Sequence, residues 1–287
     1  MLAIFKREFK SYFTGMTGFL FCAVLLLFMG IFVTYVHLLT GLASFEYSLQ
    51  SALTVYLLVI PVLTMRSLTE DKKAKIDRLL YALPLQMYQI ILGKYLAMLA
   101  VLALPVLVIG LYPLILSAFG AVNFAAAYGA LFAFFLLGAA LIALCMFLSS
   151  LADGQVVAAI LGFGSLLFLY LAKTVAAMLP STAVVSLVCF IILEILVAVI
   201  GYYLTQNIPV ACAVGGVLVV PTAIAFAVKS SLFEGLFPSL LTKLALFDRF
   251  ADFSNGLFDL SAIALYLSLA VIFVVFTVLT AEKKRWN

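Results

Sequence analysis

Long apolar runs, separated by short polar segments, occupy most of this chain. Each run holds about twenty residues, the length that an α-helix needs to cross the hydrocarbon core of a bilayer. A backbone in lipid must satisfy its hydrogen bonds internally, and the unbroken runs exclude barrel strands, which alternate apolar and polar residues. We therefore predict an all-α polytopic membrane protein. The expected transmembrane helices, about eight in number, are Gly18–Leu39, Leu49–Met65, Tyr95–Ala118, Phe124–Leu148, Val156–Ala172, Ala183–Leu204, Ile208–Val228 and Leu260–Thr280.

The number of spans determines on which side the two termini lie. Only residues 205–207 join the sixth and seventh runs, so these runs either cross the membrane twice or form one re-entrant pair. Either arrangement leaves an even number of crossings and places both termini on one side. The positive-inside rule makes that side cytoplasmic. All but four of the 16 basic residues then lie inside, the four being Lys173, Lys229, Lys243 and Arg249.

Two further segments are predicted to lie at the membrane surface. In residues 1–16, apolar side chains recur at helical spacing with basic residues between them, which predicts an amphipathic interfacial helix. The apolar positions are Leu2, Phe5, Phe9, Tyr12 and Phe13. Residues 229–259 are moderately polar and have apolar residues at helical spacing around Pro238. This pattern predicts short helices at the extracytoplasmic interface.

Composition supports the membrane assignment and narrows the chemistry. Of the 287 residues, 67% are hydrophobic and 10% are charged, whereas soluble domains have about 25% charged residues. The net charge of +4 does not indicate nucleic-acid binding, because the basic residues cluster at predicted membrane edges. The four cysteines lie in apolar runs without a CxxC pair, and the only histidine, His37, closes the first run. We therefore predict buried cysteines, no metal site, and close helix packing at Gly162 and Gly164.

The segment from Arg66 to Lys94 contains nine charged side chains, an unusual density for this chain. Thr69 is expected to cap the start of a helix, and Pro84 is expected to end it. Between them, Ile76, Leu79, Leu80 and Leu83 form one apolar stripe. The pattern predicts a short amphipathic cytoplasmic helix, and by itself it favours a loop helix that rests on lipid headgroups.

The stretch PVLTMRSLTEDKKAKIDRLLYALPLQMYQIILGKYLA resembles the ABC-2 family of ABC-transporter permeases, in particular the branch with gliding-motility and copper-processing permeases. The matching residues are Pro61, Leu63, Thr64, Met65, Arg66, Glu70, Asp71, Lys72, Lys73, Asp77, Leu79, Leu80, Leu83, Pro84, Gly93 and Lys94. FKREFKSYFTGMTGF resembles the opening interfacial helix of the family, SSLADGQVVAAIL its turn between the fourth and fifth spans, and the stretch from residue 246 to 286 its final segment. The chain departs from the family at residues 74–76, and its apolar pair 183–228 is additional to the usual six-helix core.

The resemblance implies that residues 1–287 form a single transmembrane domain and that the protein is part of an exporter. ATP and Mg²⁺ would be bound by a separate subunit, an ATP-binding cassette ATPase. The sequence agrees, because Gly93-Lys94-Tyr95 lacks the upstream glycine and the following hydroxyl of a phosphate-binding loop. Two permeases, as a homodimer or heterodimer in the plasma membrane, would pair with two ATPases, and an extracytoplasmic accessory protein is a further expected partner. Residues 66–94 would carry the coupling helix. The implied ATPase-coupling residues are Arg66, Glu70, Asp71, Lys72, Lys73, Ile76, Asp77, Arg78, Leu79, Leu80, Leu83 and Pro84.

Two other classes of function stay open. An ion-coupled secondary transporter needs ionisable groups within the membrane, and Glu194 is the only carboxylate near the centre of a predicted span. A structural, hydrogen-bonded Glu194 is the simpler interpretation. The second class is a non-transporting membrane anchor for an ATPase-driven machine. An intramembrane enzyme is disfavoured, because Ser149, Ser150 and Asp153 without a histidine do not form a nucleophilic site, so we predict no catalytic residue.

Overall fold

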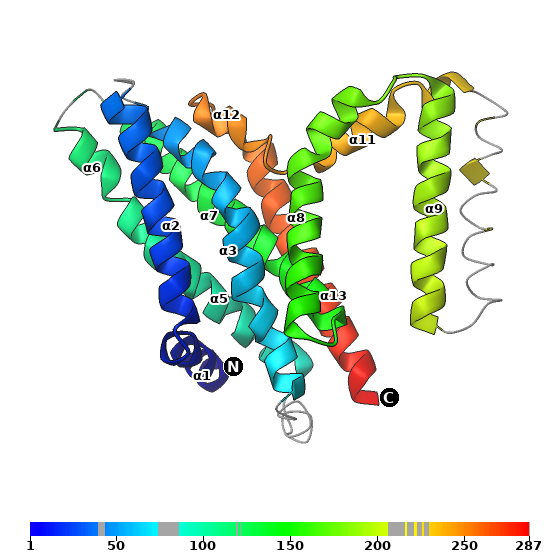
Figure 1. The fold of residues 1–287 in the computed structure, drawn as a ribbon, viewed down its shortest axis with the longest axis horizontal. Coiled ribbons are helices and arrows are strands. Elements are labelled where there is room, and N and C mark those ends of the chain that lie inside the picture. Colours follow the sequence, from blue (N-terminus) through cyan, green and yellow to red (C-terminus); the bar gives the residue numbers. More distant parts are fainter. Residues whose placement is uncertain are drawn as a thin grey trace. The chain divides into compact units, whose positions relative to one another are not determined.

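The computed structural model describes residues 1–39, 44–73, 86–118, 120, 122–205, 216, 221–222, 226 and 230–286, and the regular structure within these ranges is helical. The longer helices are α1 (Leu2–Thr14), α2 (Thr17–Val33), α3 (Phe45–Lys73), α5 (Met87–Ile109), α7 (Phe124–Leu151), α8 (Gln155–Met178), α9 (Ala183–Thr205) and α13 (Leu260–Trp286) (Figure 1). The shorter elements are the π-helix η1 (Thr34–Leu39), α6 (Tyr112–Leu116), the 3-10 helix η2 (Ser230–Phe233), α11 (Leu236–Leu244) and α12 (Phe250–Ser254).

Six helical segments among the described residues are long and apolar enough to cross a membrane. They are Thr17–His37, Phe45–Glu70, Met87–Leu116, Phe124–Leu151, Gln155–Met178 and Leu260–Lys283. The predicted all-α membrane class is thereby confirmed, and the chain is a multi-pass membrane protein. The predicted run Ala183–Leu204 lies within α9. The run Ile208–Val228 lies largely outside the described residues, so the count of eight spans stays a prediction.

The internal contacts divide the chain into two compact units, one made of Met1–Phe168 with Leu246–Asn287 and the other of Leu169–Ala245. In the second unit α9 packs against η2 and α11. Phe190 of α9 contributes by meeting the rings of Phe233 and Phe237 edge-on, with centroids 6.2 and 5.3 Å apart. Within 229–259, η2, α11 and α12 are the short helices expected there, while the assignment of 1–287 to one domain stays a prediction.

Helix α7 is the centre of the first unit, where it packs against α3, α5, α12 and α13. Its contact with α3 is close because Gly138 has no side chain at the crossing. A Cβ there would lie 2.8 Å from Leu102 Cδ2 and 3.0 Å from the Tyr56 hydroxyl oxygen. Tyr56 is fully buried, and its ring is tilted by 31° against that of Phe134 with ring centroids 4.5 Å apart. Its hydroxyl donates to the Phe134 carbonyl at 3.2 Å. Small and aromatic side chains thus fix the α3–α7 pair.

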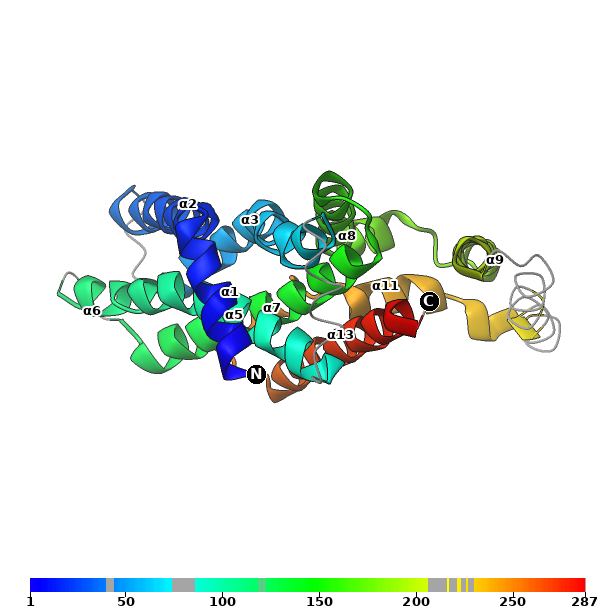
Figure 2. The ribbon, with the colours of Figure 1, turned by 90° about the horizontal axis from the view of Figure 1, so that it is seen from below.

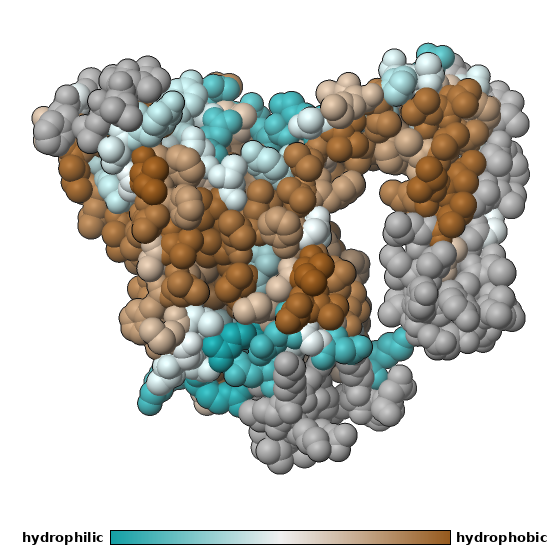
Figure 3. Space-filling model, in the orientation of Figure 1, coloured by the Kyte–Doolittle hydropathy of each residue, from teal (hydrophilic) through white to brown (hydrophobic). Residues whose placement is uncertain are grey.

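The surface of the first unit has the layered polarity of a membrane protein. Figure 3 shows a hydrophobic belt between two more polar ends, with a strongly hydrophilic layer beside α1. Figures 1 and 2 show α1 lying across the ends of the spanning helices, at the same end as the C-terminus of α13. The predicted N-terminal amphipathic helix is therefore present, and both termini lie at one end of this unit.

The boundaries around the charged segment differ from the prediction. Helix α3 continues without interruption to Lys73, so Thr69 lies inside a helix and does not cap one. Its hydroxyl instead donates to the Met65 carbonyl, one turn earlier. The third span begins at Met87 rather than Tyr95. Residues 66–73, five of them charged, extend α3 beyond its apolar part, and the mostly uncharged residues 87–94 extend α5. Main-chain hydrogen bonds continue along both segments because no residue in them breaks the helix.

Replacing Gly138 by valine should lower the free energy of unfolding by about 1–3 kcal/mol, because the added side chain overpacks the α3–α7 contact. Gly164→Val is the matched control, since a Cβ at Gly164 meets no atom within 4 Å. Thermal unfolding of the two purified variants in detergent measures the difference. Equal transition temperatures for both variants would show that the α3–α7 contact does not depend on Gly138.

Candidate functional site

A buried ammonium group joins three helices at the α1 end of the first unit. The Lys94 side chain of α5 is 2% exposed, and its Nζ lies 3.3 Å from Glu8 Oε1 of α1. The same nitrogen donates a 2.6 Å hydrogen bond to the Ser67 carbonyl of α3. Glu8 Oε1 also accepts from Arg7 Nη2 at 2.5 Å. A buried charge is tolerated when it is paired and hydrogen-bonded, so Lys94 holds α1, α3 and α5 together.

A second charged pair ties α3 to the turn between α1 and α2. Arg66 binds Glu70 with two parallel hydrogen bonds, Nε to Oε2 and Nη2 to Oε1, both 2.9 Å long. This two-pronged geometry fixes both side chains better than a single contact. Arg66 Nη1 lies 3.4 Å from the Gly15 carbonyl and 3.4 Å from Thr17 Oγ1. We call Glu8, Arg66, Ser67, Glu70 and Lys94 the basal network.

Two glycines make room for the basal network. A Cβ on Gly93 would lie 3.1 Å from Ile4 Cγ2 and 3.4 Å from the Met1 carbonyl oxygen, so its absence lets α1 rest directly on α5. Ile4 is buried in that contact. A Cβ on Gly15 would lie 2.9 Å from Arg66 Nη1. Gly93 and Lys94 therefore both have a structural role: Gly93 leaves space for α1, and Lys94 binds Glu8 of α1.

Tyr12 forms the wall of the basal network on the α1 side. Burial, together with the nearby Glu8 carboxylate, raises the pKa of its phenol above the ordinary value, so Tyr12 stays a neutral donor. The cavity enclosed by Tyr12, Ser11, Thr17 and the network side chains measures about 20 Å³. That volume holds a single water molecule and no nucleotide or organic substrate. The basal network is thus a brace between helices and not a binding pocket.

The predicted ATPase-coupling residues divide between described and undescribed parts of the chain. Arg66 and Glu70 belong to the basal network. The backbone of Asp71, Lys72 and Lys73 forms the last turn of α3. The other coupling residues lie outside the described residues, namely Ile76, Asp77, Arg78, Leu79, Leu80, Leu83 and Pro84. The structure brings the two ends of the charged segment together on α1, and the coupling assignment stays a prediction.

Glu194, the other candidate, lies in the second unit. Its side chain is buried, and its Oε2 accepts a 3.3 Å hydrogen bond from Thr222 Oγ1. A hydrogen-bonded Glu194 is the arrangement expected if this carboxylate has a structural role.

His37 and the cysteines show no catalytic arrangement in the part of the chain that the structure describes. His37 Nε2 lies 3.2 Å from Ser48 Oγ, a contact between η1 and α3. The prediction of buried cysteines is confirmed for Cys145, whereas Cys22 and Cys189 are half-buried and Cys212 lies outside the described residues. No group of three or more His, Cys, Asp or Glu residues could hold a metal ion among the described residues. Gly162 does pack closely, with its Cβ position 3.2 Å from Pro61 Cβ, whereas Gly164 has open space.

Sequence reasoning did not assign Glu8 to the site. The available signal was an acidic residue on the amphipathic helix and a lysine at the start of an apolar run, both unfavourable in lipid unless paired. Helical periodicity places residues on faces of a helix but does not say which faces of distant helices meet. The Glu8–Lys94 pair therefore required the tertiary structure.

Replacing Glu8 by glutamine should destabilise the protein by about 3 kcal/mol, because the buried Lys94 charge loses its counter-charge. The double variant Glu8→Gln/Lys94→Met should recover most of this loss, since it removes the buried charge itself. Exposed Lys10→Met is the control and should change little. Unfolding in detergent of the unsubstituted protein, Glu8→Gln, Lys94→Met and the double variant gives the coupling energy. Additive effects of Glu8→Gln and Lys94→Met would exclude the pairing.

Comparison with protein-family models, with curated proteins and with solved structures finds no match to this chain. The class that its residues and helices establish is that of a multi-pass helical membrane protein.

Proposed function

We propose that this chain is the membrane permease subunit of an ABC-2 type ABC transporter, an exporter driven by separate ATP-binding subunits that dock on residues 66–94. The observation that carries the proposal is the brace on this segment. Its first residues continue α3 and its last residues begin α5. The basal network links Lys94 of α5 to Glu8 of α1 and to Ser67 of α3, and it links Arg66 of α3 to the turn that follows α1. A segment held in this way can pass a displacement to two spanning helices at once.

The proposed mechanism follows from this geometry. ATP and Mg²⁺ are bound by the partner ATPase, and the conformational cycle of that subunit pulls on the loop between α3 and α5. Arg66 and Lys94 convert a pull on either helix into a shared movement, because each contacts α1 or the turn that follows it. Helix α7 packs against both α3 and α5, so the movement reaches the centre of the first unit. Interfaces of packed helices transmit such shifts as discrete rearrangements.

The proposal includes the assembly and the orientation. Two permeases, identical or related, pair with two ATPases in the plasma membrane, with both termini of each permease in the cytoplasm. The concentration of basic residues in segments on the side of the termini supports this orientation. Figure 1 is compatible with it, since the N-terminus and the C-terminus lie at the same end of the first unit.

Sign reversal of the basic residues in the charged segment tests the docking. Lys72→Glu/Lys73→Glu/Arg78→Glu should reduce co-purification of an ATPase with a phosphate-binding loop by tenfold or more, on the order of 1.4 kcal/mol, most visibly at low salt. Lys6→Glu/Lys10→Glu, which places the same kind of change on exposed positions of α1, is the matched control.

Three results of this assay distinguish the alternatives. Unchanged ATPase association in the sign-reversed variant would leave residues 66–94 as a headgroup-resting loop. A stable ATPase complex without nucleotide-dependent transport would favour a membrane anchor. ATP hydrolysis by the purified chain alone would contradict a permease subunit.

Single-cysteine labelling in intact cells tests the orientation, in a background without the four native cysteines. A cysteine at Lys75 should stay protected from a membrane-impermeant maleimide, and one at Lys243 should be labelled, because the proposal places them on opposite sides. A cysteine at Gln206 should be protected as well if Ala183–Val228 crosses twice. Labelling at Lys75 would invert the orientation, and labelling at Gln206 would refute eight spans.

A further inference from the structure

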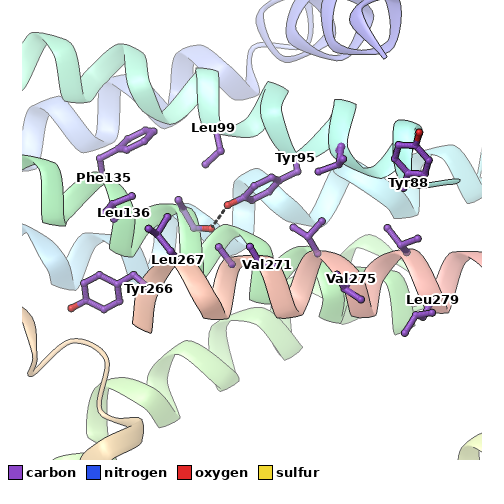
Figure 4. A pocket seen from close by; sticks show the side chains of 15 residues that line it. Tyr88, Tyr95, Leu99, Phe135, Leu136, Tyr266, Leu267, Val271, Val275 and Leu279 are labelled. Carbon is purple, nitrogen blue, oxygen red and sulfur yellow. Dashed lines mark hydrogen bonds between the residues drawn. The ribbon is translucent and has the colours of Figure 1, made fainter. Parts of the chain in front are cut away.

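An apolar groove runs along the outside of the first unit between α5, α7 and α13, with a volume of about 470 Å³. Figure 4 shows Leu267, Val271, Val275 and Leu279 of α13 following one edge of the groove, with Tyr88, Tyr95 and Leu99 of α5 along the opposite edge. Phe135 and Leu136 of α7 lie at one end of the view.

Two of the three tyrosine hydroxyls of the lining donate to carbonyl groups within the protein. The Tyr95 hydroxyl donates to the Ala139 carbonyl at 3.1 Å, and the Tyr266 hydroxyl donates to the Leu246 carbonyl at 3.0 Å. The groove therefore presents carbon to its occupant, and a polar ligand would lose its hydrogen bonds there. A hydrocarbon chain is the occupant that fits this lining best.

The length of the groove matches one leaflet of the bilayer. On α5 it extends from Tyr88 to Leu99, about 17 Å along a helix that rises 1.5 Å per residue. Half of the hydrocarbon core is about 15 Å. Phe135 lines both this groove and a second, smaller one of about 290 Å³ beside Leu107 and Tyr128. An acyl chain needs the depth of one leaflet, whereas a spanning helix needs the full thickness.

The residues at the mouth of the groove are suited to a lipid headgroup. Tyr88, 46% exposed, lies in the first turn of α5, near the α1 end of the unit. Tyrosine is enriched at the boundary between headgroups and acyl chains. On α13 the lining ends at Leu279, and one turn later Glu282 and Lys283 are exposed. Lys283 can meet a phosphate at the level where the apolar lining stops.

The side chains of the lining favour a flexible chain over a packed helix. Helices associate closely in lipid through small residues that let backbones approach each other. Here, apart from Ala139 and Ala270, the lining consists of Leu, Val, Phe and Tyr. From its chemistry, length and mouth, we propose that the groove between α5, α7 and α13 binds one acyl chain of a phospholipid in the leaflet beside α1. This lipid is a bound structural component and is independent of the transported cargo.

The first test counts lipids on the purified full-length chain by native mass spectrometry during stepwise washing with lipid-free detergent. Val275→Trp should fill the groove and should retain one phospholipid fewer than the unsubstituted protein. Ile272→Trp is the control, because it adds the same side chain to α13 at an exposed position outside the lining. Equal lipid retention in all three proteins would overturn the proposal. If the protein is a dimer and Val275→Trp dissociates it without loss of lipid, the groove binds a second copy of the chain and not a lipid.

A second measurement leaves the groove open and does not depend on the folding of Val275→Trp. The chain has a single tryptophan, Trp286, so Trp286→Phe gives a silent background for Tyr88→Trp. After loading with brominated phospholipid and washing, fluorescence quenching should persist in this variant. It should disappear in the control Leu20→Trp, an exposed position in the first turn of α2 outside the lining. Loss of quenching at the same rate in both variants would show that the groove holds no bound lipid.

Discussion

A charged group that is buried between helices must keep its partners, and this requirement organises the α1 end of the first unit. The Lys94 ammonium is 2% exposed and contacts the Glu8 carboxylate and the Ser67 carbonyl. Removing either partner would leave a buried charge without compensation. Because the two partners belong to α1 and α3, whereas Lys94 belongs to α5, the positions of three helices are linked by one ammonium group. Gly93 makes the link geometrically possible by admitting Ile4.

Within the apolar belt, the same helices must pack against specific neighbours. Lipid tails are as apolar as leucine, so the helices of the first unit cannot rely on burial of hydrophobic surface to choose their neighbours. Specific contacts make the choice instead, as where Tyr56 donates to the Phe134 carbonyl beside the side-chain-free surface of Gly138. Tyr95 and Tyr266 donate to carbonyls in a similar way and line a largely apolar groove. Hydrogen bonds from these tyrosine hydroxyls to carbonyls within the protein thus fix which helices pack together, and they also leave an apolar surface for lipid.

The brace and the groove share helix α5. Lys94 and Tyr95 are neighbours in the sequence, yet one belongs to the basal network and the other lines the groove. In the proposed transporter, α5 is one of two helices that receive the movement of the ATPase. A lipid beside Tyr95 would therefore contact a moving element, and the stiffness of the brace would decide how far the movement extends into the membrane.

The sequence by itself determined the helical membrane class, the interfacial N-terminal helix and the positions of the long apolar helices. These follow from apolar run length and helical periodicity, which act along the chain and need no knowledge of neighbours. It also pointed to the charged segment, but the prediction that Thr69 caps a helix was wrong. A threonine can cap a helix or lie within one, and the difference is whether the residues before it are already helical, as they are in α3. Only the tertiary structure decided that Glu8 meets Lys94, that Arg66 reaches the Gly15 carbonyl, and that Tyr95 faces a groove. Each of these depends on which faces of sequence-distant helices pack together, and periodicity alone leaves that choice open.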